Sequence, residues 1–301
     1  MTPFGDGSGH SAPDHGRRLL LVHAHPDDET LTTGGTMARY AAAPDTSVTL
    51  VTCTLGEEGE VIPPELALLA ADSADQLGGY RIGELANACS ALGVAYHRFL
   101  GGTGRWRDSG MVLAGHGVRA ATPARLHPRA LASREAFADQ VDALTAVLEE
   151  VAPQVVVTYA ADGGYGHPDH VRTHEIAVAA VRRVPEVARL YATVIRRATL
   201  DAGLAALSGA AGLPFRMPKP DELPSVPDGD VTAAVDVSAQ RAARLAALRA
   251  HATQVAMWEG AEVAFAMSNG VAQPLLDVEE FALLAGEPDG PEAVDLFSGV
   301  A

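Results

Sequence analysis

Short apolar runs that alternate with helix-like stretches constrain this sequence more than any other feature. The runs that predict buried strands cover residues 18–24, 47–54, 96–100, 154–160 and 189–195. The stretches that predict helices cover residues 36–42, 65–77, 82–92, 133–151 and 168–184. Because parallel strands need long crossover connections, this order predicts an α/β fold with a Rossmann-like parallel sheet flanked by helices.

The pattern changes after residue 213, where a Pro-rich stretch covers residues 214–227. A helix is predicted beyond it over 239–251, with strands over 231–237 and 280–285. We therefore expect three parts along the chain. They are a disordered tail over residues 1–16, a Rossmann-like catalytic domain over 17–213, and a smaller C-terminal α/β subdomain over 214–301 that covers the site.

Charge and composition exclude several classes of protein. The formal net charge of −16 would repel nucleic acid. No apolar run reaches the roughly 20 residues that cross a bilayer, and the first residues lack the basic start and apolar run of a signal peptide, so we expect a cytoplasmic protein without a membrane partner. Cys53 and Cys89 lack the spacing of a thiolate zinc site.

Two clusters of His and Asp follow two of the predicted strands. Residues 25–29 read HPDDE after the first strand, and residues 162–170 read DGGYGHPDH after the strand over 154–160. Ligands of doubly wound sheets gather at the carboxyl ends of the strands, where strands distant in sequence can be neighbours. The two clusters are therefore expected to converge on one point.

Two imidazoles and one carboxylate can hold a divalent metal and leave a position open for water, which suits the hydrolysis of an amide. His25 and Asp28 lie three residues apart on a turn fixed by Pro26, which leaves Asp27 free to face another direction. Either cluster alone could be an ordinary polar strand end or helix start. Together they predict a metal site.

These motifs resemble the LmbE-like (PIG-L) superfamily of metal-dependent N-deacetylases. The similarity runs from about residue 18 to residue 286 and includes TLGEEGEVI (54–62), DQLGGYRIGEL (75–85), GRWRDSGM (104–111), HATQV (251–255) and FAMSNGVAQPL (265–275). It is strongest to the subfamily that acts in mycothiol biosynthesis. The resemblance implies a hydrolase that removes acetate from N-acetyl-glucosaminyl-inositol, a small pseudodisaccharide.

The resemblance also implies roles for particular residues. One divalent metal per chain, zinc or alternatively ferrous iron, would be held by His25, Asp28 and His170. The catalytic group would comprise Asp27 as general base, Tyr165 at the oxyanion, His167 at the carbonyl or leaving amine, and Asp169 orienting His167. Either Asp27 or His167 could protonate the amine. Substrate contacts would come from Glu60, Arg81, Asp108, Met111, Gln254 and Asn269.

Three other functions are compatible with parts of this pattern. A mycothiol S-conjugate amidase would use the same metal chemistry on a larger amide. A two-His, one-carboxylate iron oxygenase would use the same ligand set, although such enzymes usually have all-β scaffolds. A sugar-binding module with an inactive site is disfavoured because the ligands and Asp27 are all present. The sequence leaves the oligomeric state open.

Overall fold

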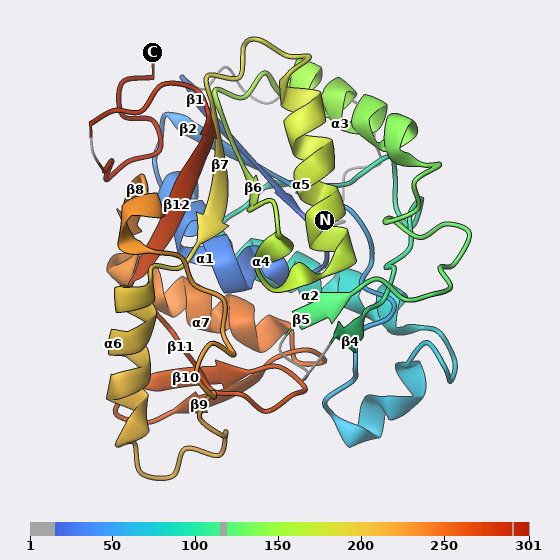
Figure 1. Ribbon diagram of the computed structural model, residues 1–301, viewed down its shortest axis with the longest axis vertical. Helices are drawn as coiled ribbons and strands as arrows, with labels where there is room; N and C mark the ends of the chain where they lie inside the picture. Colours follow the sequence, from blue (N-terminus) through green and yellow to red (C-terminus); the bar gives the residue numbers. More distant parts are fainter. Residues whose placement is uncertain (1–15, 115–118, 291, 301) are drawn as a thin grey trace.

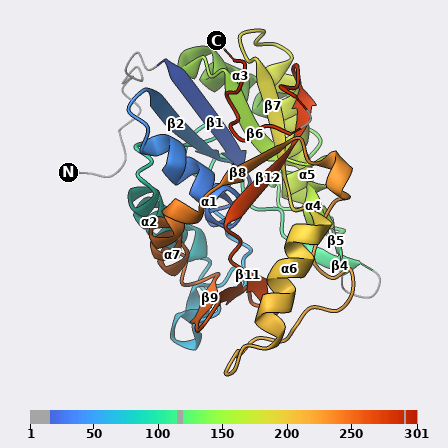
Figure 2. The same ribbon diagram turned by 90° about the vertical axis from the view of Figure 1, so that its left-hand side faces the viewer.

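A computed structural model describes residues 16–114, 119–290 and 292–300, so the tail predicted over residues 1–16 lies almost wholly outside the described residues. At its centre is a seven-stranded sheet, whose strands β2, β1, β6 and β7 are seen side by side in Figure 2. The strand order is β3 (Tyr96–Phe99), β2 (Thr46–Thr52), β1 (Arg17–His23), β6 (Val155–Tyr159), β7 (Arg189–Val194), β12 (Val278–Ala285) and β8 (Ala233–Asp236).

Five of these strands are parallel, as the sequence predicts. β1 pairs in parallel with β2 and with β6, so that Leu19 is opposite both Val48 and Val155. The chain adds strands outward from β1 to β3, then crosses back to place β6 on the other side of β1. The strand order therefore reverses between β1 and β6, which is where sheets of this kind bind their ligands.

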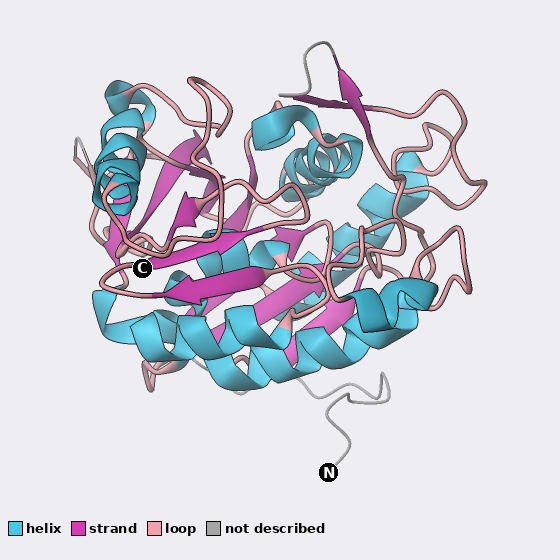
Figure 3. Ribbon diagram, turned by 90° about the horizontal axis from the view of Figure 1, so that it is seen from below, coloured by secondary structure: helices cyan, strands magenta, loops and turns pink. Residues whose placement is uncertain are grey.

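Helices cover both faces of the sheet (Figures 1 and 3). One group consists of α1 (Asp28–Ala41), α2 (Leu77–Leu92) and α7 (Arg241–Ala250), and the other of α3 (Phe137–Val151) and α5 (Pro168–Val181). Each face of the sheet has its own hydrophobic core. Along β1, Leu19 and Leu21 pack into the core beneath α1, α2 and α7, whereas Leu20 and Val22 pack into the core beneath α3 and α5. Burial on both faces explains why β1 reads as an unbroken apolar run.

The C-terminal part of the chain shares the central sheet. β12 pairs antiparallel with β7, and β8 pairs antiparallel with β12, so residues 214–301 supply two of the seven strands. The same part also forms a separate sheet of β9 (Ala256–Glu259), β10 (Val263–Ala266) and β11 (Gln273–Pro274), next to α6 (Arg197–Ser208). The expected boundary at residue 213 is thus not a boundary of the main sheet.

Two local predictions were wrong. Helix α1 begins at Asp28, eight residues before the predicted helix, because its Thr- and Gly-rich first turns are stabilised by burial against the fold and not by intrinsic propensity. Residues 64–69 form a short 3₁₀ helix where a longer helix was expected. Residues 101–128, for which no strand or helix was predicted, contain the antiparallel pair β4 (Val112–Ala114) and β5 (Arg119–Ala121). Of the described helices, none is long and apolar enough to cross a membrane.

Candidate metal centre

The two His/Asp clusters meet at the point where the strand order reverses. After β1 the chain makes a short loop and enters α1 at Asp28. After β6 it forms the single turn α4 (Gly163–Gly166) and then α5, with Pro168 in the first turn, where its missing N–H is no loss. These loops bring residues about 140 positions apart in sequence into contact, as the two clusters predict.

The carboxylate of Asp28 lies between two imidazoles. Its Oδ2 is 3.1 Å from Nδ1 of His25, and its Oδ1 is 3.3 Å from Nε2 of His170. All three residues are buried. Their facing atoms are two nitrogens and two carboxylate oxygens, which is a donor set that zinc and ferrous iron both accept.

The other side of the His25 ring faces two more carboxylates. Nε2 of His25 is 3.3 Å from Oδ2 of Asp169 and 3.6 Å from Oδ1 of Asp108. An imidazole that ligates a metal through one nitrogen commonly donates its other N–H to a carboxylate, which fixes its tautomer and orientation. Asp169 is further fixed by the backbone N–H of Ser109, at 2.9 Å. His25 is therefore prepared to offer Nδ1 as a ligand.

The buried polar atoms of the cluster fit a cation. Nε2 of His170 is buried and accepts no hydrogen bond from any described residue, although Asp28 is close. Such an atom is costly unless a ligand satisfies it. By distance alone, the described residues include two groups that could hold a metal ion: His25 with His167 and His170, and His25 with Asp108 and Asp169. Nδ1 of His167 accepts the backbone N–H of Asp169 at 3.2 Å, so Nε2 carries the ring hydrogen and has no lone pair for a metal. We therefore favour Asp28 over His167 as the third ligand.

Asp27 is the N-cap residue of α1 but does not act as an ordinary cap. Its backbone is in a positive-φ conformation (φ 122°, ψ −37°) that residues with a side chain rarely adopt. Within the described chain its carboxylate caps no amide of α1, and it lies 3.1 Å from the guanidinium of Arg81. Arg81 also donates to the carbonyl oxygens of Pro26 and, at 2.8 Å, of Gly56. The strained backbone of Asp27 thus directs its carboxylate towards the buried guanidinium of Arg81.

Burial raises the pKa of Asp27 to about 6, although Arg81 lowers it and Asp28 raises it further. Burial also raises the pKa of Asp28, but the His170 and His25 imidazoles outweigh it and hold that pKa well below its usual range. The two adjacent carboxylates therefore differ in proton affinity. Such a difference is typical of a pair in which one carboxylate transfers protons and the other stays ionised.

His167 and Tyr165 lie beside the cluster. The centroid of the His167 ring is 4.6 Å from that of His25 and 5.0 Å from that of His170, and Tyr165 is 5.2 Å from His170. Burial, His25 and His170 lower the pKa of His167 to about 2, so its ring is neutral. Since Nδ1 of His167 accepts from the Asp169 amide, the ring carries its proton on Nε2. The Asp169 carboxylate was expected to orient His167, but it contacts Nε2 of His25 instead, at 3.3 Å.

The residues expected at the substrate occupy different places. Arg81 and Asp108 are buried and lie against Asp27 and His25, respectively, rather than against each other. Glu60 is exposed, and its carbonyl oxygen accepts from the side chain of Gln254 at 3.2 Å.

Met111 and Asn269 lie at the surface. Met111 has 46% of its surface exposed next to the β4–β5 hairpin. Asn269 accepts a hydrogen bond from the amide of Val271 at 2.9 Å in the turn after β10. The contacts of the described residues do not connect Asn269 to the cluster.

Sequence reasoning missed three buried residues around the cluster. Tyr159 stacks on His170, with ring centroids 4.2 Å apart and planes 14° apart, and its hydroxyl accepts the amide of Ala24 at 2.8 Å. Glu29 pairs with His251, whose Nε2 is 2.8 Å from Oε1 of Glu29. Glu29 was visible in the HPDDE motif and His251 in the HATQV stretch, but their separation of 222 residues concealed the pairing.

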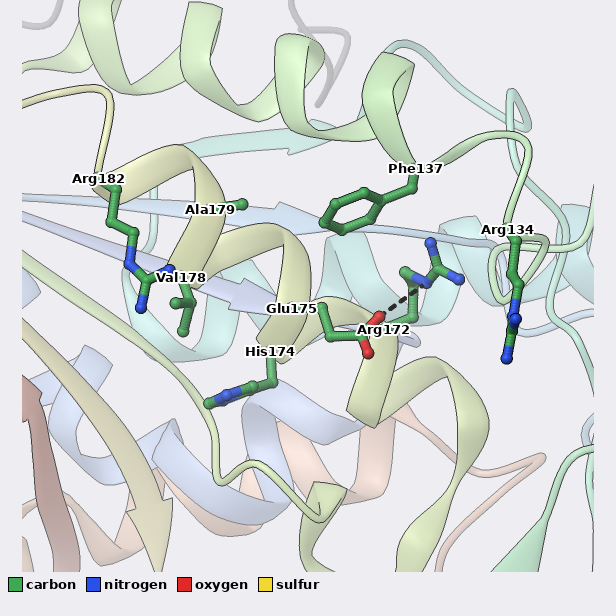
Figure 4. A pocket seen from close by; sticks show the side chains of 8 residues that line it. All are labelled: Arg134, Phe137, Arg172, His174, Glu175, Val178, Ala179 and Arg182. Atoms are coloured by element: carbon green, nitrogen blue, oxygen red, sulfur yellow. Dashed lines mark ion pairs between the residues drawn. The ribbon is translucent and has the colours of Figure 1, made fainter.

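A hollow lies beside α5 and the start of α3, away from the His/Asp cluster (Figure 4). Its volume is about 660 Å³, and it is lined by Arg134, Phe137, Arg172, His174, Glu175, Val178, Ala179 and Arg182. Figure 4 shows the ion pair of Arg172 with Glu175, at 3.3 Å, in the middle of this lining. The lining residues are distinct from those of the His/Asp cluster, so this hollow is not part of the candidate metal centre.

Comparisons with known proteins agree with this geometry. Residues 20–181, which include both clusters, match the family described as PIG-L, GlcNAc-PI de-N-acetylase. A relative from Saccharopolyspora erythraea, 1D-myo-inositol 2-acetamido-2-deoxy-alpha-D-glucopyranoside deacetylase 1, is 58% identical over 94% of each chain. A relative of the same activity from Actinosynnema mirum is 56% identical over 94% of this chain and 97% of its own.

Among solved structures, a deacetylase of the teicoplanin biosynthesis pathway, bound to teicoplanin, has a TM-score of 0.50. It is 20% identical, with 78% of this chain and 87% of that chain covered. At this level of identity, the likeness concerns the fold alone. The assignment of chemistry to this chain therefore depends on the cluster and on the sequence relatives.

Proposed function

Because the chain belongs to the PIG-L family of de-N-acetylases, we propose that it hydrolyses the N-acetyl group of N-acetyl-glucosaminyl-inositol to give acetate and glucosaminyl-inositol. This is the acetamido glycoside named for the relatives that are 58% and 56% identical. The observation that carries the proposal is the placement of Asp28 between His25 and His170, with Asp27 beside them. Two imidazoles, one carboxylate and a nearby base are a combination that metal-dependent hydrolysis of an amide can use.

We propose His25, Asp28 and His170 as the residues that would hold one divalent metal, with zinc as the metal and ferrous iron as the alternative. When bound, such a cation polarises the amide carbonyl and lowers the pKa of water. The support for this ligand set is the short separation of Asp28 from both imidazoles and the buried Nε2 of His170. Asp108 and Asp169 would orient the ring of His25.

Asp27 would act as the general base. Its carboxylate, with a pKa raised by burial to about 6, accepts a proton from the attacking water near neutral pH. The water oxygen bonds to the acetyl carbon, the carbon–nitrogen bond then breaks, and the amine leaves with one added proton. That proton is the one that Asp27 accepted from the water, and it reaches the amine from Asp27 directly or through His167.

Tyr165 would stabilise the oxyanion that develops on the acetyl oxygen. Burial raises the pKa of its hydroxyl, which therefore stays protonated and can donate a hydrogen bond. For the sugar and the inositol, we propose Glu60, Met111, Gln254 and Asn269 as contacts at the outer part of the site, with Arg81 and Asp108 close to the reacting groups. Of the outer four, Gln254 is buried, and its side-chain amide donates to the backbone carbonyl of Glu60, so these two residues lie side by side.

An assay of the purified protein with two substrates tests this function. N-acetyl-glucosaminyl-inositol should give acetate and a free amine in equal amounts, and removal of metal with a chelator should stop the reaction. A mycothiol S-conjugate should be cleaved more slowly. Faster cleavage of the conjugate would identify an amidase, and oxygen consumption without acetate release would identify an oxygenase.

A further inference from the structure

The backbone of Asp27 is held by the side chain of Glu29. Oε2 of Glu29 accepts the backbone N–H of Asp27 at 2.9 Å. This contact lies at the residue whose φ of 122° is sparsely populated for residues with a side chain. Such a conformation persists only where surrounding contacts determine it, and strain of this kind clusters at functional sites.

The other oxygen of Glu29 is bound by residues from two elements. Oε1 accepts from the Thr30 hydroxyl at 2.5 Å and is 2.8 Å from Nε2 of His251, which follows directly after α7. The side chains of Glu29 and His251 are both completely buried. A buried carboxylate with fixed partners on both oxygens has one orientation, and here that orientation presents Oε2 to the Asp27 amide.

The segment that carries His251 is itself fixed. The backbone N–H and hydroxyl of Thr253 donate to the two oxygens of Glu84 in α2, at 2.8 and 2.7 Å. The carbonyl of Thr253 accepts the amide of Ile62 at 2.9 Å. The end of α7 is therefore joined to α1, α2 and the loop after β2, and His251 cannot withdraw from Glu29 without breaking these contacts.

We propose that Glu29 and His251 form a positioning pair, which holds the strained backbone of Asp27 and so aims the Asp27 carboxylate at the reacting water. The proposal rests on the function proposed above, since the pair can position a general base only if Asp27 is the base of that reaction. Neither residue touches the substrate; both act through Asp27. The pair also gives the C-terminal part of the chain a role in catalysis.

The test compares four variants for acetate release, metal content and folding. His251→Ala should lower kcat about 10²-fold, because a displacement of about 1 Å can have that effect. KM should stay within about 3-fold and the metal should remain bound, since transition-state interactions alone are lost. Thr30→Val, a milder change, should lower kcat by a smaller factor. Glu29→Gln keeps an oxygen for the Asp27 amide and should retain most of the activity.

Glu279→Ala is the matched control. Glu279 is also a buried carboxylate from the C-terminal part, and it accepts the amides of Gly35 and Thr36 in the same helix α1, at 2.8 and 2.7 Å. It should lose stability but keep kcat. An unchanged kcat in His251→Ala and Thr30→Val, or an equal fall in Glu279→Ala, would overturn the proposal.

A crystal structure of Glu29→Ala separates this proposal from the proposed function. The backbone of Asp27 should leave the positive-φ region when its acceptor is removed, whatever the substrate is. An unchanged Asp27 backbone in that variant would overturn the positioning pair. Absence of acetate release by the wild-type protein would instead overturn the proposed function.

Discussion

The guanidinium of Arg81 lies 3.1 Å from the carboxylate of Asp27, an N-cap residue whose side chain leaves the helix it begins uncapped in the described structure. An Asp in this position usually binds the first amides of its helix, which is worth about 1 kcal/mol. Here that contribution is lost, and the positive φ costs roughly 1–3 kcal/mol more. The backbone and side chain of Asp27 therefore lower the stability of the fold at the position where the carboxylate is held against Arg81.

Replacement of Asp27 by Asn should remove the general base while keeping the size of the side chain. We expect kcat to fall by about 10²–10⁴-fold, the range that a positioned base contributes. Metal content should be unchanged because Asp27 is not among the proposed ligands. Steady-state acetate release together with metal analysis checks both statements. Turnover at the wild-type rate would exclude Asp27 as the base.

Replacement of Tyr165 by Phe should affect the transition state. The ring and its contacts with His167 and His170 are kept, but the hydroxyl donor is lost. Removal of one oxyanion donor costs about 10²–10³-fold in kcat in enzymes where this has been measured. Tyr80→Phe, at an exposed tyrosine in α2, is the control and should leave kcat unchanged. Equal rates for both variants would argue against this role for Tyr165.

Close packing of α1 can be tested at Gly35. A Cβ added there would lie 2.4 Å from Cβ of Val237, so Gly35→Ala should destabilise the protein by roughly 1–3 kcal/mol. Gly83→Ala in the exposed part of α2 is the matched control, because its Cβ would have no heavy atom of the described residues outside its own helix within 4 Å. It should stabilise by roughly 0.5–1 kcal/mol. Denaturant unfolding of both variants gives the comparison.

His97 in β3 should make stability depend on pH. Burial lowers its pKa from 6.5 to about 4 in the folded state. Above pH 6.5 the ring is neutral in both states and costs nothing. As the pH falls from about 6.5 to 4, the unfolded chain takes up a proton that the folded chain does not, so stability is lost, by up to roughly 3 kcal/mol.

The variant His97→Gln should show a smaller loss of stability over the same range of pH. His127→Gln, at an exposed histidine in the loop before α3, should behave like the wild-type protein. Urea unfolding at several pH values between 4 and 7 measures the difference. Identical pH profiles for His97→Gln and wild type would contradict the burial argument.

The sequence predicted the fold correctly where the apolar pattern and the length of a run indicate the same kind of element. The apolar runs that became β1, β2, β6 and β7 are buried on both faces, and such runs are hard to mistake. The start of α1 was missed because Thr32 and Thr33 are poor helix formers, whose hydroxyls here bind the carbonyls of Asp28 and Glu29. The strands β9, β10 and β11 are two to four residues long and give no clear pattern.

The sequence predicted that the two His/Asp clusters meet, but it did not predict the contacts around them. The two clusters could be expected to meet because each follows a strand that ends at the same edge of the sheet. The choice of His25, Asp28 and His170 as ligands came from the resemblance to the PIG-L superfamily. The contact of Arg81 with Asp27 and the pairing of Glu29 with His251 depend on how α2 and α7 pack against α1. Such contacts between distant residues leave no periodic signal in a single sequence.

Metal content of the purified chain tests the central claim most directly. The account predicts about one zinc or ferrous ion per wild-type chain, as expected for a catalytic site with three protein ligands. His170→Ala and Asp28→Ala should lose that ion, while His167→Ala should keep it. Retention of the full amount of metal by His170→Ala, or its complete loss from His167→Ala alone, would contradict the ligand set proposed here.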